Sequence, residues 1–157
     1  MYEGVKTWTR AKKGKRGVDL FAYNSVLVPI NRNRVHWALA LIDVKARTVC
    51  FLDSLRGDGS DVIKSLCRYM HDEYKDKHNG EALPGKPFTG MPPPPRLPRQ
   101  YNGVDCGAFL CIYCELLVRG VKPSIDIFTQ EDIDRLRQRI LLTCAGQGGV
   151  PRVLDAE

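Results

Sequence analysis

The run WALALID, residues 37–43, decides the fold class, because it is apolar at nearly every position. A strand of this composition is covered on both faces, so helices must pack on the sheet that contains it. Two further β-rich runs flank it, SVLVPI at residues 25–30 and RTVCFLD at residues 47–53, with short polar connections between them. The three runs predict neighbouring strands within an α+β layer architecture.

Two segments later in the chain have helical spacing. From Ser60 onward, apolar residues recur on one side and charged residues on the other, and Ser60 itself is placed to cap the helix N-terminus. Residues 107–118 are apolar almost throughout, which predicts a buried helix, and Gly120 is placed to end it.

A third helix is predicted near the C-terminus. Thr129, with Asp132 three residues later, predicts a capping box at the start of a helix that continues to about Thr143. The residues expected to face inward from it are Ile133, Leu136, Ile140 and Leu141.

The length of 157 residues and a hydrophobic content of 43% predict a single domain, 1–157, with one core. Within it we expect a basic arm over residues 1–17, a loop rich in proline and glycine over residues 79–99, and an irregular tail over residues 146–157. The loop contains four consecutive prolines, which fit either a stiff connector or a ligand for an SH3-type domain.

The sequence predicts an intracellular protein. Its apolar runs are far shorter than the roughly 18 to 20 residues of a membrane-spanning helix, and no apolar segment with a cleavage site follows the basic N-terminus. We therefore expect no membrane partner and free thiols at the six cysteines. The formal charge of +6 is concentrated in residues 6–16, which fits a nuclear-import signal, a face for an acidic protein, a nucleic-acid patch or a solvated loop. We expect the nucleus as the location, with the cytoplasm as the alternative.

Cys106 is the strongest candidate for a chemical role. It ends the sequence QYNGVDC, residues 100–106, at the N-terminus of the predicted buried helix. The backbone N–H groups and the helix dipole stabilise a thiolate over a thiol at that place. Gln100 is placed to direct its amide toward an oxyanion formed on an attacked carbonyl. The alternative for Cys106 is a small buried hydrophobe.

His36 and Asp53 each stand at the end of a predicted strand, and adjacent strands would bring them together. A cysteine protease needs a base that takes the thiol proton and a carboxylate or amide that orients the base. The alternatives are a polar residue that closes a strand for His36 and a turn former for Asp53.

The ordered set VPI, VHWALALID, FLDS and RQYNGVDCGAF resembles the catalytic core of the Ulp1/sentrin-specific protease family of papain-like cysteine peptidases. The resemblance covers roughly residues 8–142; the family's upstream region, with its Trp-Leu-Asn-Asp stretch, is not present in this sequence. It implies a papain-like fold, with a central mixed or antiparallel sheet packed by helices and the nucleophile at a helix N-terminus.

The same resemblance implies a role for each candidate residue. The implied catalytic residues are His36 as general base, Asp53 as its orienting partner, Cys106 as nucleophile and Gln100 as oxyanion donor, and the implied substrate-binding residue is Trp37, in the wall of a tunnel for a Gly-Gly tail.

The function implied is that of a monomeric isopeptidase or endopeptidase, without metal or cofactor, that cleaves after the C-terminal Gly-Gly of a ubiquitin-like modifier, SUMO first. The alternatives are a deneddylase or deubiquitinase of the same fold and a catalytically weak module that binds a ubiquitin-like protein. A nucleic-acid partner is not expected, since only Trp8 accompanies the basic arm.

An iron–sulfur protein is the alternative from another class. Cys106, Cys111 and Cys114, with Cys144 further on, match the spacing of plant-type ferredoxins. Cys111 and Cys114 fall within an apolar helical run, which points them in different directions and argues against a cluster.

Overall fold

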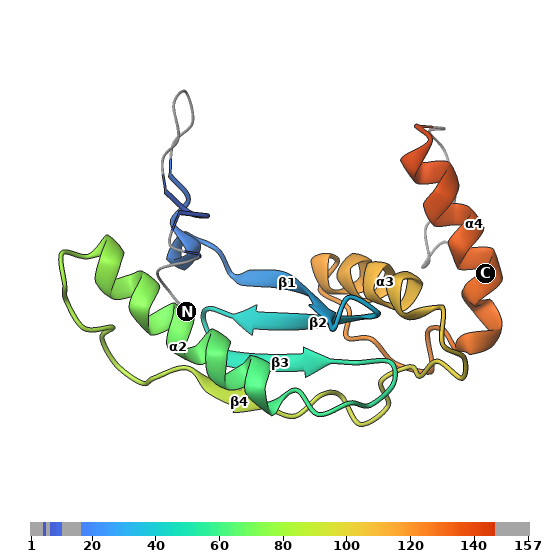
Figure 1. The fold of residues 1–157 in the computed structure, drawn as a ribbon, viewed down its shortest axis with the longest axis horizontal. Helices are drawn as coiled ribbons and strands as arrows, with labels where there is room; N and C mark the ends of the chain where they lie inside the picture. The colour runs from blue at the N-terminus through green and yellow to red at the C-terminus, as the bar shows by residue number, and fades with distance from the viewer. Residues whose placement is uncertain (1–4, 6, 11–16, 147–157) are drawn as a thin grey trace. The chain divides into compact units, whose positions relative to one another are not determined.

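The computed structural model describes residues 5, 7–10 and 17–146. Its strands form one sheet in the order β1-β2-β3-β4, in which β3 and β4 are parallel while β2 and β3 run in opposite directions (Figure 1). The strands are β1 (Ser25–Arg32), β2 (His36–Asp43), β3 (Thr48–Leu52) and β4 (Thr89–Met91). The helices are α2 (Ser60–Lys77), α3 (Cys106–Val118) and α4 (Ile133–Cys144), with 3-10 turns η1 (Leu20–Ala22) and η2 (Gln130–Asp132).

The three strands and three helices predicted from the sequence are confirmed, and so is the α+β class. The consecutive residues Ala38, Leu39 and Ala40 of β2 are all buried, as the continuous apolar run predicts. None of the helices in the described part of the chain is both long and apolar enough to cross a membrane.

The segment 79–99 is not a loop throughout. Its residues Thr89–Met91 form β4, which pairs with Thr48, Val49 and Cys50 at the edge of the sheet. A three-residue edge strand has no periodicity of its own and is fixed by its neighbour. The predicted arm and tail fall largely on residues 1–4, 6, 11–16 and 147–157, which lie outside the described residues.

The chain divides into two compact units. The first comprises residues 1–28, 40–51 and 58–92, and the second comprises residues 29–39, 52–57 and 93–157. The core of the first unit is built from buried residues of β2 and the turn after it, of β3 and α2, and of the segment before β4. These residues are Ile42, Val44, Val49, Met70 and Phe88.

Helix α2 begins at Ser60, the residue predicted as its cap, and so one residue earlier than the sequence predicts. Its N-cap is Gly59, and Ser60 is already helical, with its Oγ donating to Asp58 at 2.8 Å. A Cβ on Gly59 would lie 2.1 Å from Cδ1 of Phe51. The prediction of Ser60 as the cap is therefore wrong, because close packing on β3 requires glycine there.

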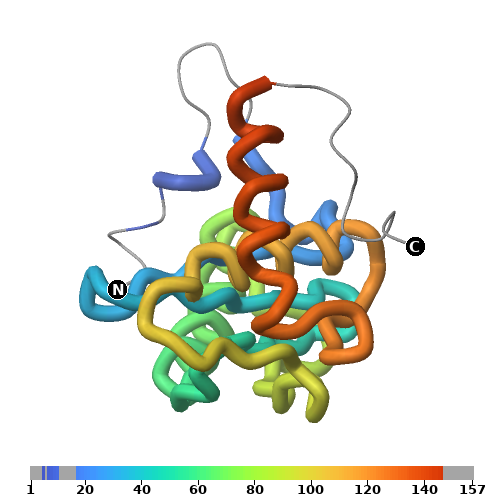
Figure 2. Tube along the Cα trace, turned by 90° about the vertical axis from the view of Figure 1, so that its right-hand side faces the viewer, coloured from blue at the N-terminus to red at the C-terminus, as the bar shows by residue number. Residues whose placement is uncertain are grey.

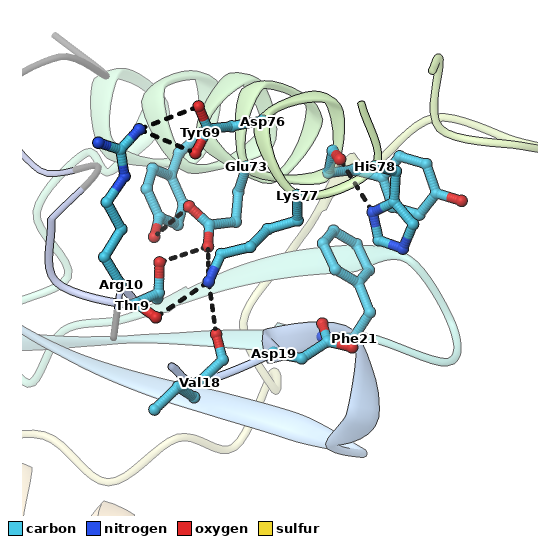
Figure 3. Close-up of polar contacts among 11 residues, drawn as sticks. Thr9, Arg10, Val18, Asp19, Phe21, Tyr69, Glu73, Asp76, Lys77 and His78 are labelled. Carbon is cyan, nitrogen blue, oxygen red and sulfur yellow. Dashed lines mark hydrogen bonds and ion pairs between the residues drawn. The ribbon is translucent and has the colours of Figure 1, made fainter. Parts of the chain in front are cut away.

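A buried carboxylate on α2 holds the N-terminal segment in the first unit (Figure 3). Glu73 is fully buried and accepts hydrogen bonds from Thr9 Oγ1 at 2.5 Å and Tyr69 OH at 3.2 Å. Lys77 Nζ lies 3.7 Å from Glu73 Oε1 and donates to the backbone carbonyls of Thr9 and Val18. Burial, together with the neighbouring Glu73, raises the pKa of Tyr69 to about 12.

In the second unit, the predicted helix ends are confirmed. Gly120 has a φ of 75°, and the N–H groups of Gly120 and Val121 donate to the carbonyls of Leu117 and Leu116, which is a Schellman motif. The capping box of Thr129 and Asp132 is present, although it opens η2 rather than α4 directly.

The inward face predicted for α4 is correct except at one residue. Ile133 and Leu136 are buried and Ile140 is half-buried, whereas Leu141 is 68% exposed. With 3.6 residues per turn, Leu141 lies roughly 100° from the centre of the stripe formed by the other three. The C-terminal end of α4 also extends beyond α3 in both views (Figures 1 and 2).

Candidate active site

All four predicted catalytic residues belong to the second unit. Cys106 is the first residue of α3, is 6% exposed, and follows the N-cap Asp105, as the sequence predicts. The first backbone bond of the helix runs from Phe109 N to Asp105 O at 3.0 Å. The N–H groups of the first turn, which starts with Cys106, therefore have no acceptor inside the helix.

A tight turn places His36 at the start of β2. Asn33 and Arg34 both have positive φ, 53° and 63°, and Val35 N donates to Arg32 O at 3.1 Å. Two central residues of positive φ define the type I′ turn, whose twist matches that of the flanking strands. The turn fixes the register in which the imidazole leaves the strand.

The His36–Asp53 pair is formed. His36 Nε2 lies 2.7 Å from Asp53 Oδ1. Asp53 is buried and also accepts from Leu55 N at 2.8 Å and Gly57 N at 3.2 Å, so the turn after β3 fixes its orientation. A carboxylate only accepts, so Nε2 carries a hydrogen, and in the neutral imidazole Nδ1 keeps the lone pair. Nδ1 is thus the nitrogen that can take a proton from a thiol.

Gln100 is held in one orientation. Its side chain is 1% exposed, and Nε2 donates to the carbonyl of Asn102 at 2.6 Å. A carbonyl oxygen only accepts, so the amide nitrogen of Gln100 is the group that faces Asn102. The amide oxygen Oε1 then faces Ser54, whose hydroxyl donates to Oε1 at 2.6 Å. Nε2 retains a second hydrogen that can stabilise an oxyanion. The sequence contains the Asp53–Ser54 pair, but nothing in it indicates that Ser54 orients the amide.

Trp37 lies beside the start of α3. A Cβ on Gly107 would be 3.9 Å from Trp37 Cδ1. Trp37 follows His36 in the chain and Gly107 follows Cys106, so the two chain neighbours of these candidates lie next to each other. The Trp37 side chain is 42% exposed, which leaves it available to a substrate. No hydrogen bond to the Cys106 thiol occurs among the described residues. Catalytic hydrogen bonds are commonly long without substrate and tighten when it binds.

Asp105, directly before the nucleophile, lies at the centre of a network that sequence reasoning missed. Its carboxylate accepts from Asn102 Nδ2 at 2.6 Å, Gln130 Nε2 at 2.8 Å and Arg137 Nη1 at 2.6 Å. Burial alone would raise the pKa of Asp105, but the three hydrogen bonds together hold it below its ordinary value. Gln130 and Arg137 carry no sequence signal, because they approach only through the packing of α4 and η2 in this unit.

Three of the other cysteines, Cys50, Cys111 and Cys114, lack the lowered pKa of a nucleophile. Cys50 is buried on β3, and burial raises its pKa to about 11. Burial also raises the pKa of Cys111 and Cys114, which lie on the continuous helix α3 and not on a loop that could wrap a cluster. Within the described ranges, no group of three His, Cys, Asp or Glu residues is arranged to hold a metal ion.

Comparisons with known proteins identify a family for this sequence. The family described as "Ulp1 protease family, C-terminal catalytic domain" matches residues 1–147. Human Sentrin-specific protease 2 is 35% identical over 140 residues, which cover 89% of this chain and 22% of that protein. The chain therefore spans less than a quarter of this relative.

Solved structures show the same fold. The C-terminal Ulp1 protease domain in complex with Smt3, the yeast ortholog of SUMO, superposes with a TM-score of 0.62 at 25% identity, over 87% of this chain and 57% of that one. The SUMO protease Ulp1 with its catalytic cysteine oxidised to a sulfenic acid gives a TM-score of 0.67 at 28% identity, over 92% and 62%.

Proposed function

Because the chain belongs to the Ulp1 protease family, we propose that it is a cysteine peptidase that cleaves after the C-terminal Gly-Gly of a SUMO-type modifier. The observation that carries the proposal is the 2.7 Å contact between His36 and Asp53, on strand ends in the unit whose helix α3 begins with Cys106. A binding module would not need a carboxylate that two backbone N–H groups fix and aim at an imidazole.

The proposed reaction is acyl transfer through a thioester. His36 Nδ1 takes the Cys106 proton, and the sulfur attacks the carbonyl carbon of the terminal glycine. The oxyanion receives hydrogen bonds from Gln100 Nε2 and from the backbone N–H at the start of α3. The carbon–nitrogen bond breaks as the imidazolium protonates the leaving amine, and water then hydrolyses the thioester. Asp53 stabilises the imidazolium throughout.

SUMO is the proposed modifier, and NEDD8 and ubiquitin are the alternatives. The support is the identity of its relatives, which are sentrin-specific proteases and a Ulp1 domain bound to a SUMO ortholog. A nuclear location remains a prediction from the basic segment 6–16.

The test is cleavage of SUMO, NEDD8 and ubiquitin, each extended by a short peptide after Gly-Gly, by the parent chain and two variants. Cys106→Ala should abolish cleavage while leaving thermal unfolding close to that of the parent. Cys111→Ala is the matched control, since Cys111 is exposed on the same helix, and it should cleave at the parent rate. Equal rates for parent and Cys106→Ala would refute the proposal.

A further inference from the structure

Asp105 occupies the N-cap of α3 but does not act as a cap. An aspartate in this position normally accepts a hydrogen bond from the N–H of the second or third helical residue. The side chain of Asp105 makes no such bond. Its carboxylate turns instead toward Asn102, Gln130 and Arg137, and it is 5% exposed.

The consequence concerns the first turn of α3. Because Asp105 does not cap it, the N–H groups of Cys106, Gly107 and Ala108 receive no acceptor from the N-cap side chain. These are the backbone donors nearest the sulfur, and an oxyanion formed by attack of Cys106 would develop beside them. A carboxylate in the same place would occupy the donors and repel the developing negative charge.

The two carboxylate oxygens are held by different partners. Asn102 and Gln130 both donate to Oδ2, whereas Arg137 donates to Oδ1. Among the side chains that the structure describes, Arg137 is the only donor to Oδ1. Without it, Oδ1 is a buried acceptor with no side-chain partner, and the uncapped N–H groups of the adjoining helix turn are the donors within reach of a rotation of the side chain.

We propose that Arg137, assisted by Gln130, is a positioning residue that holds the Asp105 carboxylate away from the N-terminus of α3 and so keeps the oxyanion donors available. The inference rests on the proposed peptidase function and deepens it, since neither residue touches the reacting atoms. It assigns α4 a role in catalysis through a residue 31 positions after the nucleophile.

The first test is Arg137→Ala, assayed on the modifier that the parent cleaves. We expect kcat to fall about 10- to 100-fold, the range caused by small misplacements of catalytic groups, with KM nearly unchanged. Arg135→Ala is the matched control, because Arg135 lies on the same helix and, among the described residues, pairs only with the half-buried Asp132, at 3.2 Å; its kcat should equal that of the parent. A parent-like kcat for Arg137→Ala would overturn the proposal.

The second test separates positioning from loss of stability. Adding Asp105→Ala to Arg137→Ala removes the carboxylate that would occupy the donors, so kcat should rise by about 5-fold or more above that of the single variant. If the loss in Arg137→Ala reflects damaged folding, the second substitution lowers kcat further, and the proposal is wrong. If Arg137→Ala does not fold, Arg137→Gln with and without Asp105→Ala makes the same comparison.

The two proposals can fail separately. A folded parent chain that cleaves none of the three modifiers refutes the peptidase function. An active parent whose Arg137 variants behave like the parent, or are not rescued by removal of Asp105, refutes the positioning role alone.

Discussion

In each unit of the chain, polar side chains hold a buried carboxylate, Glu73 in the first unit and Asp105 in the second, and the two carboxylates differ in their place relative to the proposed nucleophile. Glu73 in the first unit is bound by Thr9, Tyr69 and Lys77. Asp105 in the second unit is bound by Asn102, Gln130 and Arg137. None of these three partners of Glu73 is a proposed catalytic residue, whereas Asp105 directly precedes Cys106. We therefore expect the same local chemistry to stabilise the fold in one unit and, as proposed above, to keep the oxyanion donors beside the proposed nucleophile available in the other.

The largest effect is expected at a third buried carboxylate, which contacts the base itself. Asp53→Ala should lower kcat by about 10³- to 10⁴-fold, because His36 loses the partner that sets its tautomer and stabilises its charge. Steady-state cleavage of a Gly-Gly-extended modifier measures this. A loss below 10-fold would show that Asp53 is only a turn former.

Glu73→Ala should have a large effect on stability rather than on catalysis. It leaves Lys77 and the hydroxyl of Thr9 without their buried partner, so the free energy of unfolding should fall by about 3 kcal/mol. The kcat of the folded protein should stay unchanged. Urea unfolding and kcat together measure this, and Glu81→Ala, at an exposed position after α2, is the control. If kcat fell by more than the unfolded fraction of the variant explains, Glu73 would also affect catalysis. That result would contradict the contrast between the two units.

A smaller catalytic effect is expected where a backbone contact holds Asp53. A Cβ on Gly57 would lie 2.7 Å from Asp53 Oδ2. The carboxylate cannot move away from it without losing its contact with His36. Gly57→Ala should therefore lower kcat about 10- to 100-fold. Gly103→Ala is the matched control, since a Cβ there meets nothing within 4 Å. Equal kcat values for the two variants would mean that the turn after β3 does not orient the base.

The smallest effect is on acid stability. The folded-state pKa of Asp105 lies below its ordinary value of 3.8 because the hydrogen bonds from Asn102, Gln130 and Arg137 outweigh burial. Its contribution to stability is therefore present above the ordinary pKa and is lost as the pH falls through the folded-state pKa. Between pH 7 and about pH 3, Asp105→Asn should lose less stability than the parent in urea unfolding. Parallel pH profiles would show that the carboxylate is not stabilised by its partners.

The parts of the fold that follow local rules were predictable from the sequence. Strand β2 is continuous apolar sequence, the capping box at Thr129 is a four-residue pattern, and Gly120 ends α3 as helix-end chemistry requires. The proposed catalytic residues were predictable as candidates, because they stand at element ends and in a family-like order. The structure adds that His36 contacts Asp53 and that Ser54 orients Gln100.

The parts that the sequence could not supply depend on packing between distant segments. Arg137 approaches Asp105 from 32 positions away, and nothing in its own neighbourhood distinguishes it from Arg135. Strand β4 forms because it pairs with the free edge of β3. Helix α2 is capped by Gly59 rather than Ser60 because Phe51 occupies the space of a side chain.

The most direct test of a nucleophile at the start of α3 is covalent capture by SUMO, NEDD8 and ubiquitin that carry a thiol-reactive group at the C-terminus. The account predicts a mass increase of one modifier for the parent and for Cys111→Ala, strongest with SUMO, and none for Cys106→Ala. A folded parent that forms no adduct with any of the three, or a Cys106→Ala variant that is labelled as the parent is, would contradict it.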